Sequence, residues 1–257
     1  MQRVCVFVDG ENFRHSICSL FPTFNKDDHL PKEALWGEFF DHIVEQATGG
    51  EGKRLRTYWY VVRNLDFRPH KLYDATIIAT SGQKSPNNNF IEYLTSCNYI
   101  YNNECNISAT CSCTDVEQAH SKITGRKGVI QKRFAGWSVL YNGISNRHRQ
   151  VEFRKEGAIT YDLMQDCFLK EKSVDVALAI DMLELKDIYD VALIVSGDQD
   201  YIPAVKSVKN KGKIVANVSF KKENGKLLPG GAWRLNVETD FSLAIDHDTS
   251  SYYLNLI

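Results

Sequence analysis

Two apolar runs that end in acidic residues decide the fold: VCVFVDGEN at residues 4–12 and VALIVSGDQD at residues 191–200. In each run, five apolar residues, most of them β-branched, precede the first polar one, which is typical of a strand buried on both faces. Strands of this kind belong to parallel sheets that are covered by helices. The sequence therefore predicts an α/β domain with a mostly parallel central sheet.

Helical and strand-like segments alternate around these two runs. Apolar residues at 33–47 have helical spacing, and the aromatic and β-branched residues at 56–62 favour a strand. Strand–helix–strand alternation implies parallel pairing with right-handed crossovers. In the C-terminal part we expect a helix over 174–186, a strand over 191–195, a helix over 203–210 and a strand over 214–220.

The middle of the chain does not follow this alternation. Residues 84–150 are interpreted as an insertion of irregular or β structure, with strand-like pieces such as Trp137–Tyr141, and residues 68–80 as a possible helix. We therefore expect a single domain over 1–245 that carries this insertion, followed by a tail over 246–257. The insertion is also the place where we expect contacts with a second copy or a protein partner.

The cysteines number seven, and an odd count fits reduced thiols better than a closed disulfide framework. Cys5, Cys18 and Cys167 lie among apolar residues and are interpreted as small core residues. A second group could bind zinc, but its spacing, C-x7-C-x5-C-x-C, lacks the paired knuckles of structural zinc sites, so free thiols are favoured. That group is Cys97, Cys105, Cys111 and Cys113, with His120 downstream.

Composition excludes several classes of protein. With 31 basic and 32 acidic residues, the formal net charge is −1, which excludes a uniformly basic mode of nucleic-acid binding. No stretch approaches the roughly 20 apolar residues of a membrane span, and the first apolar run is too short for a signal peptide. We expect a soluble, cytoplasmic protein.

The acids that follow the two buried strands predict a metal site. Asp9 follows the first strand, and Asp198 and Asp200 follow the second, so parallel pairing brings all three to the edge where such sheets bind ligands. Helix capping explains one acid per loop, but not several. Crowded carboxylates repel one another unless they are protonated or bridged by a cation, and oxygen ligands suit Mg²⁺ or Mn²⁺.

The helix over 174–186 adds two more acids. Asp175 lies in its first turn, where the helix dipole tolerates a carboxylate. Asp181 lies in the apolar stripe and therefore faces the core or a cleft, where a carboxylate needs a partner. Six residues separate the two acids by about 120° and about 9 Å, so both cannot bind one ion unaided. Asp175 is the better ligand candidate, and Asp181 would orient a neighbour or stabilise the packing.

Three blocks of this sequence resemble the NYN domain, which belongs to the PIN-like nuclease superfamily. Its pattern has Asp-x-x-Asn after the first strand, a Lys-x-Val-Asp-Val-x-Leu-Ala-x-Asp helix and a Ser-Gly-Asp-x-Asp-Phe turn. The matching blocks are VDGENF at 8–13, KSVDVALAID at 172–181 and SGDQDY at 196–201, followed by Gly-Lys-x-Val at 212–215. Tyr201 stands where the pattern has Phe, and the middle of the chain, roughly 63–150, has no counterpart.

The resemblance implies a Rossmann-like, PIN-like three-layer fold and a metal-dependent ribonuclease, which we expect to cut RNA internally. By position, Asp9, Asp175, Asp198 and Asp200 would hold Mg²⁺ or Mn²⁺, and Asn12 would orient a carboxylate or the phosphate. The expected catalytic residues are Asp9, Asn12, Asp175, Asp181, Asp198 and Asp200. The expected substrate-binding residues are Ser196, Lys172, Lys206, Lys209 and Lys213.

Charge is distributed in blocks. Residues 175–200 hold seven acids and one lysine, whereas residues 206–226 hold seven lysines and one glutamate. These lysines could form a rail for phosphates beside the acids, or simply a solvated face. The lysines are Lys206, Lys209, Lys211, Lys213, Lys221, Lys222 and Lys226. A further basic group is Arg147, His148, Arg149, Arg154 and Lys155, while Tyr58, Trp59 and Tyr60 offer either base stacking or core packing.

Two other functions remain open on the sequence. A haloacid dehalogenase-like phosphatase also places an Asp after its first strand, but it needs Asp-x-Asp there, and this chain has Glu11 followed by Asn12. A non-catalytic RNA-binding module is the other alternative, and the presence of every acidic position argues against it.

Overall fold

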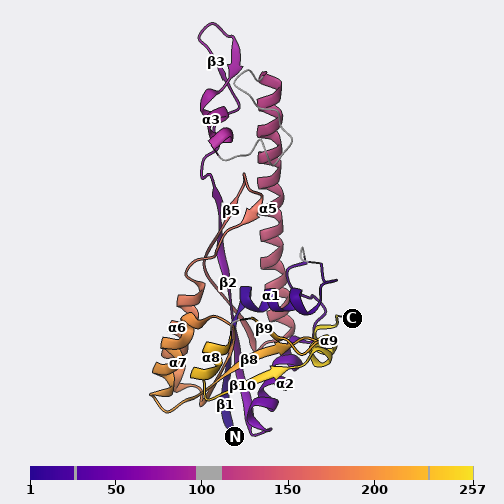
Figure 1. The fold of residues 1–257 in the computed structure, drawn as a ribbon, viewed down its shortest axis with the longest axis vertical. Helices are drawn as coiled ribbons and strands as arrows, with labels where there is room; N and C mark the ends of the chain where they lie inside the picture. Colours follow the sequence, from indigo (N-terminus) through magenta and orange to yellow (C-terminus); the bar gives the residue numbers. More distant parts are fainter. Residues whose placement is uncertain (26–27, 97–111, 231, 257) are drawn as a thin grey trace. The chain divides into compact units, whose positions relative to one another are not determined.

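The computed structural model describes residues 1–25, 28–96, 112–230 and 232–256 (Figure 1). The chain divides into two compact units. Three of the divisions fall within elements, namely β2 (Gly52–Arg68), α5 (Cys113–Arg147) and β5 (Val151–Asp162), and the fourth lies between Glu171 and Lys172. Unit 1 comprises Met1–Arg63, Trp137–Gly157 and Lys172–Ile257, and unit 2 comprises Asn64–Gly136 and Ala158–Glu171.

The main sheet has eight strands and is mostly parallel. The strand order is β10, β8, β7, β1, β2, β5, β6, and β9 pairs with β8. The bounds of the strands not yet given are β1 (Gln2–Asp9), β6 (Cys167–Phe168), β7 (Val191–Val195), β8 (Ile214–Lys221), β9 (Leu227–Leu228) and β10 (Phe241–Ile245).

The register of β1 sets the position of the acids. β1 runs parallel to β2 and to β7, and Val8 lies opposite Trp59 on one side and Val195 on the other. Asp9 and Ser196 therefore leave the sheet at the same, carboxyl edge. The prediction of a parallel sheet whose acid-bearing strands end together is confirmed.

Helices cover both faces of the sheet in unit 1. α2 contacts β1 and α9, while α6 packs against β1 and α7, and α7 against β8 (Figure 1). The arrangement confirms the predicted three-layer α/β fold. One layer contains α1 (Gly10–Leu20), α2 (Trp36–Thr48) and α9 (His247–Leu254); the other contains α6 (Val174–Glu184), α7 (Ile202–Lys209) and α8 (Trp233–Glu238).

Aromatic side chains fill the core between the sheet and the first helical layer. Phe13 of α1 lies 5.3 Å from Trp59 and 5.2 Å from Phe220, measured between ring centroids, and Trp36 lies 4.9 Å from Trp59. All four rings are at most 1% exposed. Burial of such large apolar surfaces holds α1, which begins directly after Asp9, against the sheet.

The prediction of irregular or β structure over 84–150 is wrong for most of the segment that the structure describes. Cys113–Arg147 is one helix of 35 residues, α5, and Trp137–Tyr141 belongs to it. The sequence did not indicate α5 because it contains four glycines, and each glycine lowers helix stability by about 1 kcal/mol relative to alanine in a helix interior. They are Gly125, Gly128, Gly136 and Gly143.

Unit 2 has a core of its own. Phe67, Phe90, Leu94 and residues of α5 pack together there. β3 (Thr76–Ile78) pairs antiparallel with β4 (Lys84–Pro86), and α3 (Asn88–Ser96) follows. The helix suggested for 68–80 is therefore wrong: β2 extends to Arg68, and three β-branched residues form β3.

The cysteine predictions have mixed outcomes. Cys5 is fully buried in β1 as expected, whereas Cys18 and Cys167 are only half-buried. Of the possible zinc ligands, Cys97, Cys105 and Cys111 lie outside the described residues, so a zinc site stays a prediction. The ring of His120 lies 5.6 Å from that of Phe90 in an edge-on contact.

The segment expected to be a C-terminal tail forms α9, which packs on α2 through the rings of Tyr253 and Phe39, 5.9 Å apart. The single-domain boundaries stay a prediction. In the part of the chain that the structure describes, no helix combines the length and the apolar character that crossing a membrane requires.

Candidate metal centre

Asp9 is the buried centre of the candidate site. It ends β1, caps α1 and is only 3% exposed. One carboxylate oxygen accepts a hydrogen bond of 3.1 Å from the backbone N–H of Asn12, and the other accepts one of 2.8 Å from the hydroxyl of Ser196. Burial nevertheless raises the pKa of Asp9 to about 6, and the nearby charges of Asp175 and Asp198 add to this. A cation beside Asp9 would stabilise its charged form.

Tyr201 links Asp9 to a second carboxylate. Its hydroxyl lies 3.0 Å from Oδ1 of Asp175 and 3.3 Å from Oδ2 of Asp9, and the residue is 1% exposed. Burial, with the charges of Asp9 and Asp175, raises the pKa of Tyr201 far above its usual range, so the phenol stays protonated and donates. A phenol has one proton to donate, so the two acids share a single donor.

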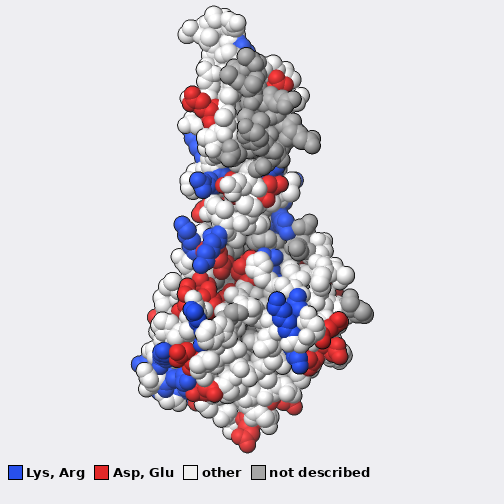
Figure 2. Space-filling view, in the orientation of Figure 1, with Lys and Arg blue, Asp and Glu red and all other residues white. Residues whose placement is uncertain are grey.

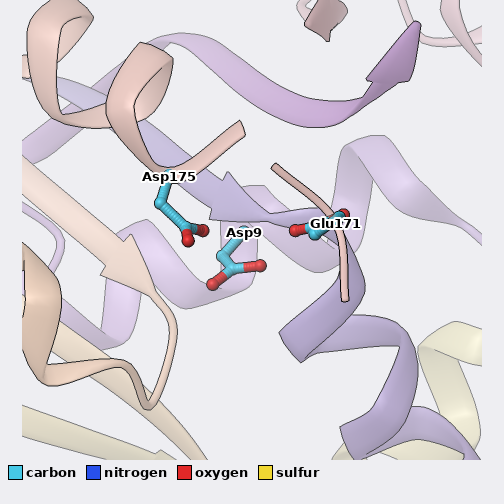
Figure 3. Close-up of side chains that lie close together, drawn as sticks. All are labelled: Asp9, Glu171 and Asp175. Carbon is cyan, nitrogen blue, oxygen red and sulfur yellow. The ribbon is translucent and has the colours of Figure 1, made fainter. Parts of the chain in front are cut away.

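Three carboxylates converge at this point. Oxygens of Asp9, Glu171 and Asp175 all lie within 4.8 Å of one another (Figure 3). Asp9 comes from the end of β1, Asp175 from the first turn of α6, and Glu171 from the segment just before Lys172, where the third part of unit 1 begins. A group of carboxylates alone suits a hard divalent cation such as Mg²⁺ or Mn²⁺. The residues present thus fit the expected ion.

Glu171 is the member of this group that the sequence did not reveal. It stands between Lys170 and Lys172, a pattern that indicates a solvated surface. Only its position just ahead of the block 172–181 could have pointed to it. Glu171 is half-buried in the structure.

Asp198 and Asp200 occupy the same edge of the sheet but do not belong to this group in the described chain. Asp198 accepts a hydrogen bond of 2.9 Å from the backbone N–H of Asp200, and thereby caps the short helix Gln199–Tyr201. Its own N–H donates to the hydroxyl of Ser196 at 3.1 Å. Asp198 is half-buried and Asp200 exposed. Their role as metal ligands stays a prediction.

Asp181 is bound to another partner. Its Oδ2 accepts a hydrogen bond of 2.7 Å from the hydroxyl of Tyr60 and lies 3.9 Å from Nε of Arg154. The contact ties α6 to β2, as expected for a residue that stabilises packing. Tyr60 and Trp59 are fully buried and Tyr58 is 5% exposed, so the alternative of core packing holds for these aromatics.

The predicted lysine rail is divided between two edges of the sheet. Lys206 and Lys209 form ion pairs of 3.1 Å with Glu238 and Asp240, respectively. Lys213 directly precedes β8 and lies at the amino edge, opposite Asp9. On the face in Figure 2, lysine and arginine side chains form separate groups and no continuous stripe.

Other lysines are at the acidic edge. Lys221 ends β8 there, and Lys222 and Lys226 lie in the turn that follows it. Lys172 is exposed and directly follows Glu171. Among the second basic group, Arg147 pairs with Glu33 at 3.3 Å, and the guanidinium of Arg154 lies 4.9 Å from the ring centre of Tyr58.

Replacing Tyr201 by phenylalanine should lower the stability of the metal-free protein and increase the stabilisation that Mn²⁺ provides. Loss of the shared donor leaves Asp9 and Asp175 poorly satisfied, so we expect a loss of about 1–3 kcal/mol of stability without metal. The melting temperature in EDTA should fall by roughly 2–10 °C. Adding Mn²⁺ should then raise the melting temperature of the variant by more than that of the wild type. The cation relieves more repulsion between Asp9 and Asp175 in the variant, because the shared donor is missing.

Tyr60→Phe is the matched control, because Tyr60 is also a buried tyrosine that donates to a carboxylate, Asp181. It should lower the melting temperature in EDTA while leaving the Mn²⁺-induced rise as in the wild type. Equal Mn²⁺-induced rises for the two variants would rule out a link between Tyr201 and metal binding.

Comparison with known proteins places this geometry in context. The model of the NYN domain matches residues 3–228. No curated protein matches the chain. Among solved structures, a protein of unknown function from Vibrio parahaemolyticus is similar at 12% sequence identity and a TM-score of 0.40, over 96% of this chain and 94% of that one.

Proposed function

Because this chain belongs to the NYN domain family of PIN-like, nuclease-type domains, we propose that it is a metal-dependent ribonuclease that cuts RNA internally. The observation that carries this proposal is the convergence of Asp9, Glu171 and Asp175 within 4.8 Å. Asp9 is almost fully buried, and its pKa is raised, as is common for carboxylates at functional sites. The expected cytoplasmic location stays a prediction.

In the proposed reaction, the protein's task is to position the ion and the phosphodiester. Bound Mg²⁺ or Mn²⁺ would activate a water molecule and neutralise charge on the phosphate. Asp9, Asp175 and Glu171 would hold the ion, while Ser196 and the N–H of Asn12 keep the carboxylate of Asp9 in place. No histidine nucleophile is required.

The remaining predicted residues have additional tasks. Asp198 and Asp200, which lie at the same edge, would add further carboxylate ligands for the ion, as their places in the family's pattern imply. Phosphates flanking the cut would be bound by lysines at this edge. These are Lys172, Lys221, Lys222 and Lys226. Lys206 and Lys209 instead hold Glu238 and Asp240.

The phosphatase alternative is disfavoured by the position of Glu11. Its carboxylate pairs with Arg14 at 2.6 Å and with His15 at 3.0 Å, within α1. It is therefore engaged away from Asp9 and cannot replace the second aspartate that phosphatase chemistry needs.

The proposal is tested with labelled RNA substrates. Linear single-stranded RNA, a hairpin and a circular RNA are incubated with the protein and Mn²⁺, beside a DNA of the same sequence and a phosphomonoester. We expect cleavage of RNA, including the circle, which has no ends and so can be opened only by an endonuclease. Rapid turnover of the phosphomonoester with intact RNA would instead support the phosphatase.

A further inference from the structure

Trp233 is an unusually exposed tryptophan. It begins α8 and is 64% exposed, whereas the other three tryptophans, Trp36, Trp59 and Trp137, are at most 8% exposed. Most large aromatic side chains are largely buried, so an aromatic ring this exposed is uncommon. Rings of this kind are enriched where proteins bind partners or stack on bases.

Arg234 is held beside this ring. Its guanidinium carbon lies 5.3 Å from the centre of the Trp233 ring, and Nη1 donates a hydrogen bond of 2.8 Å to the side chain of Gln199. A guanidinium has five N–H donors, and the bond to Gln199 uses one of them. Arg234 therefore offers a positioned cation whose other donors suit a phosphate.

The two residues border a hollow of about 410 Å³ at the carboxyl edge of the sheet. The hollow is lined by Asn12, Gly197, Asp198, Gln199, Trp233 and Arg234. The hollow lies next to Asp9. Asn12, which lines it, donates its N–H to Asp9, and so does the hydroxyl of Ser196, the residue before Gly197.

Close packing brings Pro229 against this edge of the sheet. A Cβ added to Gly197 would lie 2.2 Å from Cγ of Pro229, which precedes α8 by a few residues. Only glycine allows that approach, so Pro229 packs directly against the turn that carries Asp198. Arg234, in α8, contacts the same turn through its hydrogen bond to Gln199.

We propose that this hollow binds one unpaired nucleotide of the RNA, with its base stacked on Trp233 and a phosphate on Arg234. This inference rests on the proposed ribonuclease function and names its substrate class: single-stranded or looped RNA. In a duplex both faces of each base are already stacked, so only an unpaired base can use the ring. The neighbouring phosphate then lies toward Asn12 and the carboxylates.

Binding is measured in EDTA, where no cleavage is expected, by titrating the protein with single-stranded RNA and following tryptophan fluorescence. Stacking on Trp233 should quench the emission of the exposed tryptophan. Trp233→Ala should weaken binding roughly 5- to 150-fold. Trp233→Phe should retain part of the affinity, and Arg234→Ala should weaken binding and reduce its dependence on salt.

Tyr252→Ala is the matched control, because Tyr252 is an exposed aromatic residue, 70% exposed, on α9. It should bind RNA as the wild type does. Equal affinity of Trp233→Ala and the wild type, or equal affinity for duplex and single-stranded RNA, would overturn the inference. If Trp233→Ala binds and cleaves RNA as the wild type does, this subsite alone is rejected. If the wild type binds RNA but does not cleave it, the proposed ribonuclease function is rejected.

Discussion

Asp9→Asn should abolish metal-dependent RNA cleavage while making the metal-free protein more stable. Asparagine has the same size, and its amide oxygen can still accept from the N–H of Asn12. Its amide nitrogen cannot accept from Ser196 but can donate to that hydroxyl, and the side chain brings no charge to the ion. A bound metal supplies several kcal/mol of transition-state stabilisation, so we expect a loss of about 10³-fold or more.

The gain in stability follows from the pKa of Asp9. Its value rises from 3.8 to about 6 on folding, so the folded state binds the proton more tightly than the unfolded state. This stabilising contribution is complete at low pH and is lost as pH rises through about 6. At pH 7 without metal, the charged Asp9 therefore costs stability, and Asp9→Asn should gain about 1–3 kcal/mol.

Cleavage assays and urea unfolding in EDTA measure the two effects in the same preparation. Asp187→Asn is the control, because this exposed acid follows the end of α6 opposite to Asp175 and pairs with Lys186, and it should change neither property much. If Asp9→Asn kept a tenth of the activity, or lost stability in EDTA, Asp9 would not have the role assigned to it.

Gly10→Ala should destabilise the whole of unit 1. A Cβ at this position would lie 2.3 Å from the backbone oxygen of Tyr60 and 3.0 Å from Cγ1 of Val61. The nearer atom belongs to the backbone of β2, a paired strand, so it cannot move aside as the end of a flexible side chain could. We expect a loss of about 2–4 kcal/mol, which overpacking of a rigid core causes.

Urea unfolding checks this value, with Gly143→Ala as the matched control. Gly143 lies inside α5, and an added Cβ there meets nothing within 4 Å. Alanine should therefore stabilise the protein by about 0.5–1 kcal/mol. An unchanged unfolding midpoint for Gly10→Ala would show that α1 and β2 leave enough space for a Cβ at this position.

The sequence predicted the parts of the fold that local patterns determine. Buried runs such as 4–8 and 191–195 predicted parallel strands, and their ends located Asp9 at the ligand-binding edge. α5 escaped prediction because its glycines lower helix propensity, while packing of residues such as Val116 and Ile123 in unit 2 stabilises it. Tertiary contacts of this kind leave little trace in a single sequence.

The site was predicted only in part, for a related reason. Asp9 and Asp175 were predicted because Asp9 ends a buried strand and Asp175 lies in the first turn of a helix, and both elements are recognisable in the sequence. Glu171 belongs to neither kind of element, and only the folded chain brings it beside the other two. Tyr201 stands where the family's pattern has phenylalanine, and nothing in the sequence indicates that its hydroxyl contacts both acids. Lys213 was placed beside the acids by its position in sequence, although the register of β8 puts it at the opposite edge.

The central claim is that the acidic group cleaves RNA with a divalent ion. The most direct measurement is cleavage of a single-stranded RNA by the wild type and Asp9→Asn, first after EDTA treatment and then after Mn²⁺ is restored. The account predicts no cleavage in EDTA, recovery by the wild type with Mn²⁺, and none by Asp9→Asn. Cleavage that persists in EDTA, or that Asp9→Asn recovers with Mn²⁺ to the wild-type rate, would contradict it.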